Sequence, residues 1–132
     1  RDVASAVSVP VIAAGGIMGG ADVAAMLGAG AQAAMLGMAF LSAPESLIHA
    51  EHRRLLLQPA GDAATARTAV TQAFTGKPAR SIANRWTEDM DELQRRLPNC
   101  FNGLPAGRPL AAAAAKAGRA DLMMMWAGDG YA

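Results

Sequence analysis

Two sets of glycines are the residues best suited to chemistry in this sequence. Gly15 and Gly16 follow an apolar run at residues 9–14, and Gly37 follows a second apolar run at residues 31–36. Glycine lets an anion such as a phosphate approach backbone N–H groups closely, because no Cβ stands in the way. Glycine is equally common where a chain simply turns from a strand into a helix. The pattern therefore leaves two interpretations open, a phosphate site and a pair of turns.

A strand–helix–strand unit is predicted to position these glycines. The two apolar runs are apolar on both faces, which is typical of buried parallel strands. Between them, the positions of Val23, Met26 and Leu27 have a helical spacing, with Asp22 in the first turn and with Gly28 and Gly30 as the helix stop. A right-handed crossover of this kind brings both strand ends to the same edge of the sheet, which is where ligands bind in such folds. In barrel enzymes, the loops after strands seven and eight often form a phosphate site.

The rest of the chain is predicted to contain helices separated by loops. A helix is expected to begin at Pro44 and to end before Pro59, and residues 65–74 give a mixed signal before a turn at residues 76–78. A second helix carries an apolar stripe from Trp86 to residue 97 and is capped by Asn84 or Thr87. Residues 99–109 are expected to be a loop, and residues 110–117 a helix that Gly118 ends.

Composition excludes several classes of function. The formal net charge of +1 argues against a basic nucleic-acid-binding domain. A single cysteine, Cys100, excludes an internal disulfide framework and a cysteine-built zinc site. The low net charge leads us to expect no nucleic-acid partner. Since no apolar run reaches the length of a membrane-spanning helix, we also expect no membrane partner.

Other candidate residues are expected to serve the fold. His49 and His52 are three residues apart, but no third ligand completes a metal site, so we expect helix or surface packing and no metal. Residues 28–33 match a relaxed dinucleotide fingerprint, but they follow a helix and precede a strand, which is the reverse of the required context. Arg80 and Asn84 are expected to make a structural tie between an excursion and the main fold, not to act in catalysis. The methionines at positions 123–125 are expected to fill a core or an interface.

Several segments together resemble a known family. The first are residues 9–17, Val-Pro-Val-Ile-Ala-Ala-Gly-Gly-Ile, followed by Gly30-Ala31, Met35-Leu36-Gly37, Phe40-Leu41 and Glu45. This stretch looks like the last two βα units of a flavin- or phosphate-binding TIM barrel. Inosine monophosphate dehydrogenase and the FMN-dependent enoyl-acyl carrier protein reductases share it in looser form. Residues 73–80, Ala-Phe-Thr-Gly-Lys-Pro-Ala-Arg, then Asn84-Arg85 and Trp126-Ala127-Gly128, narrow the resemblance to nitronate monooxygenase, formerly 2-nitropropane dioxygenase.

The resemblance implies an FMN enzyme that oxidises alkyl nitronates with O2 to a carbonyl compound and nitrite. Carried over by position, the FMN phosphate would be held by one loop containing Gly15 and Gly16 and by a second containing Met35, Leu36, Gly37 and Met38. The family usually has threonine where Met38 stands, so the backbone N–H is kept but a hydroxyl is missing. It usually has glutamine where Asp129 stands, so a carboxylate replaces an amide at that polar contact. The catalytic histidine of the family belongs to an earlier strand end, before residue 1, so the resemblance assigns no catalytic residue here.

These observations set the expected organisation of the chain. We expect an α/β protein, the carboxyl-terminal part of a TIM barrel, with residues 1–58 as its last two βα units and residues 59–132 as a mixed loop and helical excursion. We expect a cytoplasmic enzyme whose partners are a small nitronate and O2. Two alternatives remain open, an FMN-dependent enoyl-thioester reductase of the same barrel class and a non-catalytic fragment whose glycines only make turns.

Overall fold

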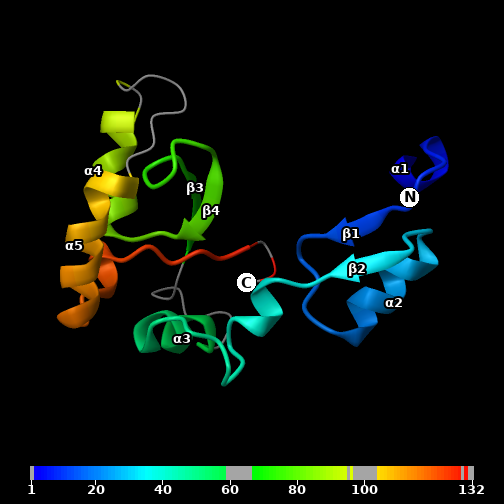
Figure 1. Ribbon diagram of the computed structural model, residues 1–132, viewed down its shortest axis with the longest axis horizontal. Coiled ribbons are helices and arrows are strands. Elements are labelled where there is room, and N and C mark those ends of the chain that lie inside the picture. The colour runs from blue at the N-terminus through cyan, green and yellow to red at the C-terminus, as the bar shows by residue number, and fades with distance from the viewer. Residues whose placement is uncertain (1, 59–66, 95, 97–103, 129, 131–132) are drawn as a thin grey trace. The chain divides into compact units, whose positions relative to one another are not determined.

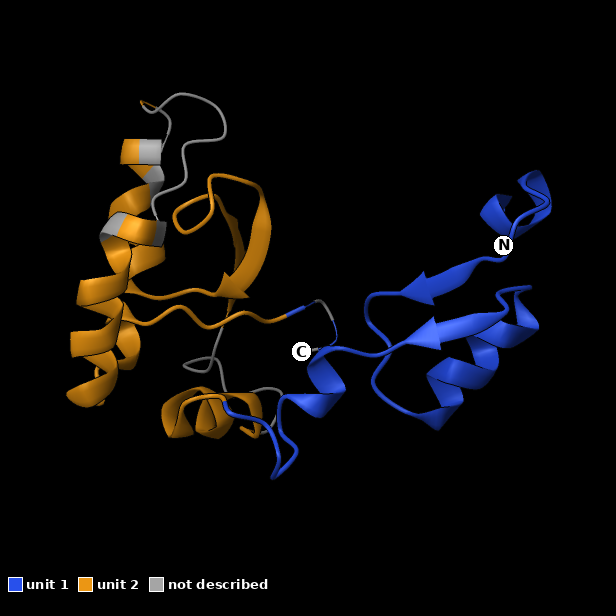
Figure 2. Cartoon of the chain, viewed as in Figure 1, with its two compact units in different colours: residues 1–47, 128–132 blue, residues 48–127 orange. Residues whose placement is uncertain are grey.

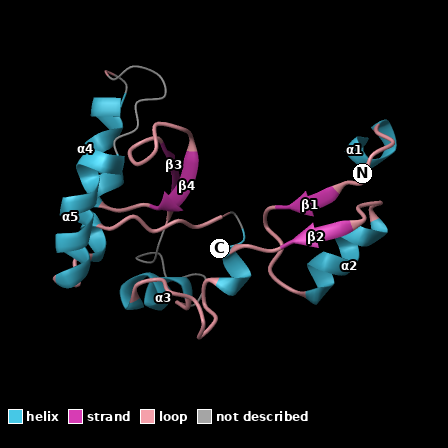
Figure 3. Ribbon diagram, viewed as in Figure 1, coloured by secondary structure: helices cyan, strands magenta, loops and turns pink. Residues whose placement is uncertain are grey.

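The computed structural model describes residues 2–58, 67–94, 96, 104–128 and 130 and is mixed α/β (Figures 1 and 3). The chain divides into two compact units, residues 1–47 with 128–132 and residues 48–127 (Figure 2). The expected subdivision at residue 58 concerns the parts of a larger barrel and stays a prediction. No helix in the described ranges has both the length and the apolar character needed to cross a membrane.

The first unit is built around a parallel strand–helix–strand arrangement. Its elements are α1 (Asp2–Ala6), β1 (Ile12–Ala14), α2 (Gly20–Gly28), β2 (Ala33–Met35) and the 3₁₀ helix η1 (Met38–Phe40). Strands β1 and β2 pair in parallel, with Ile12 opposite Ala33 and Ala14 opposite Met35. Helix α2 packs against β2. This confirms the predicted unit, although both strands are shorter than the apolar runs that predicted them.

Helix α2 ends in a hydrogen-bonded glycine turn. Gly30 has a φ of 102°, a left-handed conformation that side chains disfavour. Its amide donates to the Leu27 carbonyl at 3.0 Å, and the amide of Ala31 donates to the Met26 carbonyl at 3.1 Å. These two bonds form a Schellman motif, which satisfies carbonyls that the helix end would otherwise leave unpaired. The predicted helix end is confirmed.

The second unit consists of a β-hairpin covered by helices. Its elements are α3 (Ala50–Leu56), β3 (Thr68–Thr71), β4 (Ala79–Ile82), α4 (Arg85–Gln94), α5 (Leu104–Lys116) and the 3₁₀ helix η2 (Ala120–Leu122). Strands β3 and β4 are antiparallel. The segment after η2 lies beside β4, where the Ile82 amide donates to the Met125 carbonyl at 2.8 Å and Ser81 bridges to Trp126. This segment therefore continues the hairpin for a short distance as a third extended chain.

The core of the second unit gathers around Phe74. Phe74, Ile82 and Met125 are almost completely buried. The Phe74 ring stacks on Trp86 at a centroid distance of 6.2 Å and meets the edge of Trp126 at 5.2 Å. Burying rings of this size supplies much of the apolar stabilisation of a small unit. Met123 and Met125 are buried in the same unit, which confirms the expected packing role of the methionine run.

The helix expected to begin at Pro44 begins later, so that prediction is wrong. Residues 41–46 form successive turns instead, in which the amide of Ala43 donates to the Phe40 carbonyl and the amide of Ser46 to the Ala43 carbonyl. Helix α3 starts only at Ala50, after His49, whose extended backbone and ring nitrogen cap it. The helix therefore begins where the His49 side chain caps it, and not at Pro44 and Glu45, which give a weaker start signal.

The loop expected at residues 99–109 is wrong for residues 104–109, and residues 99–103 lie outside the described part of the chain. Helix α5 already begins at Leu104 and contains Pro109. Pro105 stands in the first turn, where no amide hydrogen bond is lost, and Pro109 forfeits one bond inside the helix. The predicted helix at residues 110–117 is confirmed as the later part of α5, and Gly118 ends it with a φ of 64°.

The hairpin itself was not predicted. Of the mixed segment at residues 65–74, residues 68–71 form β3, and residues 65–66 lie outside the described ranges. The predicted turn at Gly76 is present, with a φ of 71° at that residue. Alternation in β3 is weak because Val70 is exposed while the polar Thr71 is buried, so the strand lacks the usual apolar signature.

Candidate functional site

The glycines singled out in the sequence lie at one edge of the parallel sheet. Gly15 and Gly16 directly follow β1, and residues 36–38 directly follow β2, whose last residue is Met35 (Figure 1). Because Ala14 pairs with Met35 in parallel, the chain leaves both strands side by side at their carboxyl ends. The structure thus brings together the six residues predicted to hold a phosphate, namely Gly15, Gly16, Met35, Leu36, Gly37 and Met38. Their role toward a cofactor stays a prediction.

The backbone angles separate these glycines into two kinds. Gly15 and Gly16 have φ values of 96° and 68°, so the turn after β1 itself requires glycine at both positions. Gly37 has a φ of −113°, which any residue adopts. A Cβ added to Gly37 would meet no atom within 4 Å apart from its chain neighbours. The turn therefore explains the first two glycines, whereas neither backbone strain nor packing in the described chain explains the third.

The N-terminus of α2 is already occupied by a carboxylate of this chain. Asp22 Oδ2 accepts hydrogen bonds from the amides of Met18 at 2.9 Å and Gly19 at 3.0 Å. The Asp22 side chain thereby supplies the negative charge that an anion could otherwise supply at this helix end. An anion at the glycine edge would instead meet the amides of Gly16 and Gly37, for which no acceptor is found among the described residues. The Asp22 carboxylate therefore reduces what the N-terminus of α2 could contribute to binding an anion.

The side chain of Met38 contacts a residue from the other end of the chain. Its sulfur accepts a hydrogen bond from the amide of Gly128 at 2.8 Å. Gly130 also lies at this edge, since a Cβ on it would stand 2.6 Å from Cγ of Met18 and 3.4 Å from the carbonyl oxygen of Gly16. Asp129, where the family usually has glutamine, lies outside the described residues.

The two histidines are used in packing within the second unit, as expected. Nδ1 of His49 accepts from the Glu51 amide at 3.1 Å, and its Nε2 faces the Ala115 carbonyl at 3.0 Å. Nε2 of the buried His52 faces the Trp126 carbonyl at 2.9 Å, so this nitrogen carries the proton. Burial lowers the pKa of His52, and the bond to the Trp126 carbonyl opposes that effect. In the described ranges no cluster of three or more potential ligands could hold a metal ion.

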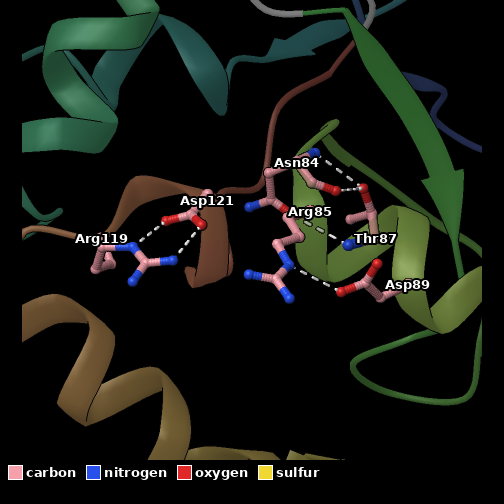
Figure 4. A network of polar contacts seen from close by, with 6 residues as sticks. All are labelled: Asn84, Arg85, Thr87, Asp89, Arg119 and Asp121. Atoms are coloured by element: carbon pink, nitrogen blue, oxygen red, sulfur yellow. Dashed lines mark hydrogen bonds and ion pairs between the residues drawn. The ribbon is translucent and has the colours of Figure 1, made fainter.

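Asn84 ties three parts of the second unit together. Its Oδ1 accepts from the Thr87 amide at 3.1 Å, and Thr87 Oγ1 accepts from the Asn84 amide at 2.9 Å (Figure 4). This reciprocal pair caps α4, which settles the cap position in favour of Asn84. The Nδ2 of Asn84 also donates to the carbonyls of Ala120 at 3.1 Å and Met123 at 2.7 Å. These bonds all lie within the second unit, and the expected tie between the excursion and the barrel stays a prediction.

Arg80 likewise serves the hairpin, because its Nη1 donates to Thr68 Oγ1 across the two strands at 3.2 Å. Arg119 and Asp121 form an ion pair that was not predicted from the sequence, and Figure 4 shows it beside this network. The hydrogen bond and the charge of Arg119 lower the pKa of Asp121, and both groups lie at the surface. Their spacing of two residues gives no helical pattern that could have predicted the pair.

The fold and this edge define the class of the protein. A parallel strand–helix–strand unit with glycine-bearing turns at its carboxyl edge is typical of α/β proteins whose ligands bind at the ends of the strands. The sequence matches the family described as nitronate monooxygenase over residues 1–132. The chain belongs to this family.

Similar proteins and structures agree with that membership. The chain is 44% identical over 124 residues to a nitronate monooxygenase of Paraburkholderia phytofirmans, covering 93% of this chain and 33% of the relative. It is 38% identical over 128 residues to a probable nitronate monooxygenase of Bacillus subtilis, covering 96% of this chain and 35% of that one. The chain thus spans about a third of the length of these curated relatives.

Two solved structures are also similar. A nitroalkane oxidase from Streptomyces ansochromogenes matches with a TM-score of 0.82 and 47% identity, over 98% of this chain and 35% of that one. FabK from Thermotoga maritima matches with a TM-score of 0.71 and 27% identity, over 98% of this chain and 40% of that one.

Proposed function

We propose that this chain supplies the phosphate-binding end of an FMN-dependent enzyme that oxidises alkyl nitronates with O2 to a carbonyl compound and nitrite. Gly37 carries the proposal, because among the three glycines of the candidate site it alone is explained by neither its backbone angles nor its packing. A ligand that fills the space beside it would explain the absence of a side chain. Membership of the nitronate monooxygenase family supplies the reaction class.

The residues present suit the phosphate of FMN. The amides of Gly16, Gly37 and Met38 would bind its oxygens, and the absence of side chains at the two glycines would let the phosphate approach. Bound FMN would accept electrons from the nitronate and pass them to O2. No catalytic role is assigned to a residue of this chain, and its two histidines are both committed to packing contacts.

We further propose that the first unit forms the last two βα units of a TIM barrel, with a helical excursion following it. The two strands present Ile12 and Met35 on one face at 63% and 62% exposure, although both side chains are large and apolar. In a closed barrel such a face packs against side chains of the remaining strands. On this proposal the active protein is a cytoplasmic enzyme that acts on a small nitronate and O2, without a nucleic-acid or membrane partner.

The alternative reaction, reduction of an enoyl thioester by reduced nicotinamide, is disfavoured by the comparisons. The nitroalkane oxidase structure is 47% identical to this chain, compared with 27% for FabK. The curated relatives at 44% and 38% identity are also named nitronate monooxygenase and probable nitronate monooxygenase.

One set of assays tests the proposal. The purified enzyme that contains this chain should be yellow and should release FMN on denaturation. It should produce nitrite from an alkyl nitronate only when O2 is present. The same preparation should not oxidise reduced nicotinamide with an enoyl thioester. A protein that remains colourless after reconstitution with FMN would refute the cofactor, and enoyl-thioester reduction without nitrite release would refute the reaction.

A further inference from the structure

Two methionines of the first unit face two glycines that come from the other end of the chain. Met18 lies in the turn after β1, and Met38 is the first residue of η1, which follows β2 at the edge where the phosphate site is proposed. The Met38 sulfur accepts the amide hydrogen of Gly128 at 2.8 Å, and Met18 lies against Gly130. The residues in contact are 90 positions apart in the first pair.

The contact with Met18 explains why position 130 is a glycine. Gly130 is not among the glycines with positive φ, so its backbone conformation does not require glycine. A Cβ there would stand 2.6 Å from Cγ and 2.9 Å from Sδ of Met18, far inside van der Waals contact. The same Cβ would be 3.4 Å from the carbonyl oxygen of Gly16, which belongs to the candidate phosphate site. Gly130 therefore lies directly against the turn after β1.

The contact with Met38 is polar. A thioether sulfur is a weak acceptor, but an amide that is directed at it still forms a bond that an aliphatic side chain cannot provide. Threonine, which the family usually has at this position, is too short to make the same contact in the same way. The change to methionine thus removes a hydroxyl from the site and adds an anchor for the Gly128 amide.

We propose that Met18 and Met38 act as a thioether clamp, a pair of positioning residues that hold Gly128 and Gly130 against the phosphate-binding edge. The clamp should help to close the site around the FMN phosphate, and this consequence rests on the proposed function. It goes beyond that function because it assigns a role to Met38, which stands where the family usually has threonine.

A double-mutant cycle tests the Met18 half of the clamp. Gly130→Ala should weaken FMN binding by about tenfold, as expected when a small overpacking contact displaces a binding segment. Adding Met18→Ala should restore most of that loss, because the shorter side chain makes room for the new methyl group. Gly28→Ala is the matched control, since a Cβ at that helical position meets nothing within 4 Å and should leave FMN affinity unchanged. FMN affinity is measured by fluorescence titration of the apoprotein. Additive effects of the two substitutions would overturn this half of the proposal.

Hydrogen exchange tests the Met38 half without any need for FMN. Met38→Leu keeps the side-chain volume and removes the acceptor, so the Gly128 amide should exchange about threefold faster in the apoprotein, the effect of losing one weak bond. Exchange at amides within α2 should not change. An unchanged rate at Gly128 would refute the Met38 anchor. If the wild-type protein does not bind FMN but Met38→Leu still speeds this exchange, the clamp stands and the proposed function fails.

Discussion

Replacing Gly37 by alanine separates a cofactor role from a role in the turn. The backbone at position 37 has a φ of −113° and a ψ of −67°, and an added Cβ meets no atom within 4 Å beyond its neighbours. Alanine should therefore keep the fold and raise the free energy of unfolding by about 0.4–1 kcal/mol, because it restricts the unfolded chain. If the phosphate of FMN occupies the same space, the methyl group of the introduced alanine should displace that phosphate from a backbone amide at this edge.

The expected loss of affinity follows from the bond that is disrupted. A hydrogen bond to a charged acceptor contributes about 1.5–3 kcal/mol, and about 1.4 kcal/mol corresponds to a tenfold change, so FMN affinity should fall roughly tenfold to a hundredfold. The assay combines FMN titration of the apoprotein with urea unfolding of the same variant, and Gly28→Ala is the control for replacing a glycine without touching the edge. Stability and affinity should change in opposite directions only for Gly37→Ala. Unchanged FMN affinity in that variant would show that Gly37 lies away from the cofactor.

Three further substitutions test the second unit. Ser81→Ala should lower the free energy of unfolding by about 1 kcal/mol, because the buried hydroxyl loses its 2.8 Å bond to the Met125 carbonyl, which keeps a backbone donor; a change below the error of urea unfolding would contradict this. The lowered pKa of His52 means that the unfolded chain binds the proton more tightly, so the wild type should lose stability as the pH falls below about 6.5, and His52→Gln should lose less; parallel pH profiles for the two proteins would refute the assignment. In Gly107→Ala, the added Cβ would stand 3.1 Å from the Trp86 ring, so the Trp86 fluorescence maximum should shift and stability should fall by about 1 kcal/mol; an unshifted spectrum would show that the ring is not packed there.

Local sequence signals predicted the strands and the helix of the first unit because residues close in sequence determine where these elements begin and end. The apolar runs, the acidic first turn of α2 and the glycine beyond its end each act over a few residues, and each is present in the structure. Gly30 illustrates why this works, since the left-handed turn that ends α2 needs nothing from the rest of the chain except a residue without a Cβ. The location of the six candidate site residues at one edge then follows from parallel pairing alone.

The errors fall where distant contacts decide the structure. Helix α3 begins after His49 because that ring caps the helix and also reaches the Ala115 carbonyl, 66 residues away. Strand β4 is completed by the bonds of Ser81 and Ile82 to Met125, which no local pattern announces. Helix α5 extends through Gly107 where the Trp86 ring packs against it, so a glycine that suggests a loop in the sequence instead makes room for a neighbour.

Two distinct physical causes explain glycines near the candidate site, and the distinction decides how far the site can be argued. Gly15 and Gly16 are required by positive φ, and Gly130 is required by the approach of Met18. Gly37 meets neither condition, and it lies where both strands of the parallel sheet end. A sequence pattern treats these residues alike, which is why turn and phosphate interpretations were equally open from the sequence. Of the three glycines among the candidate site residues, backbone angles and available space leave only Gly37 unexplained. The cofactor hypothesis therefore depends on that residue, and its replacement is the sharpest test.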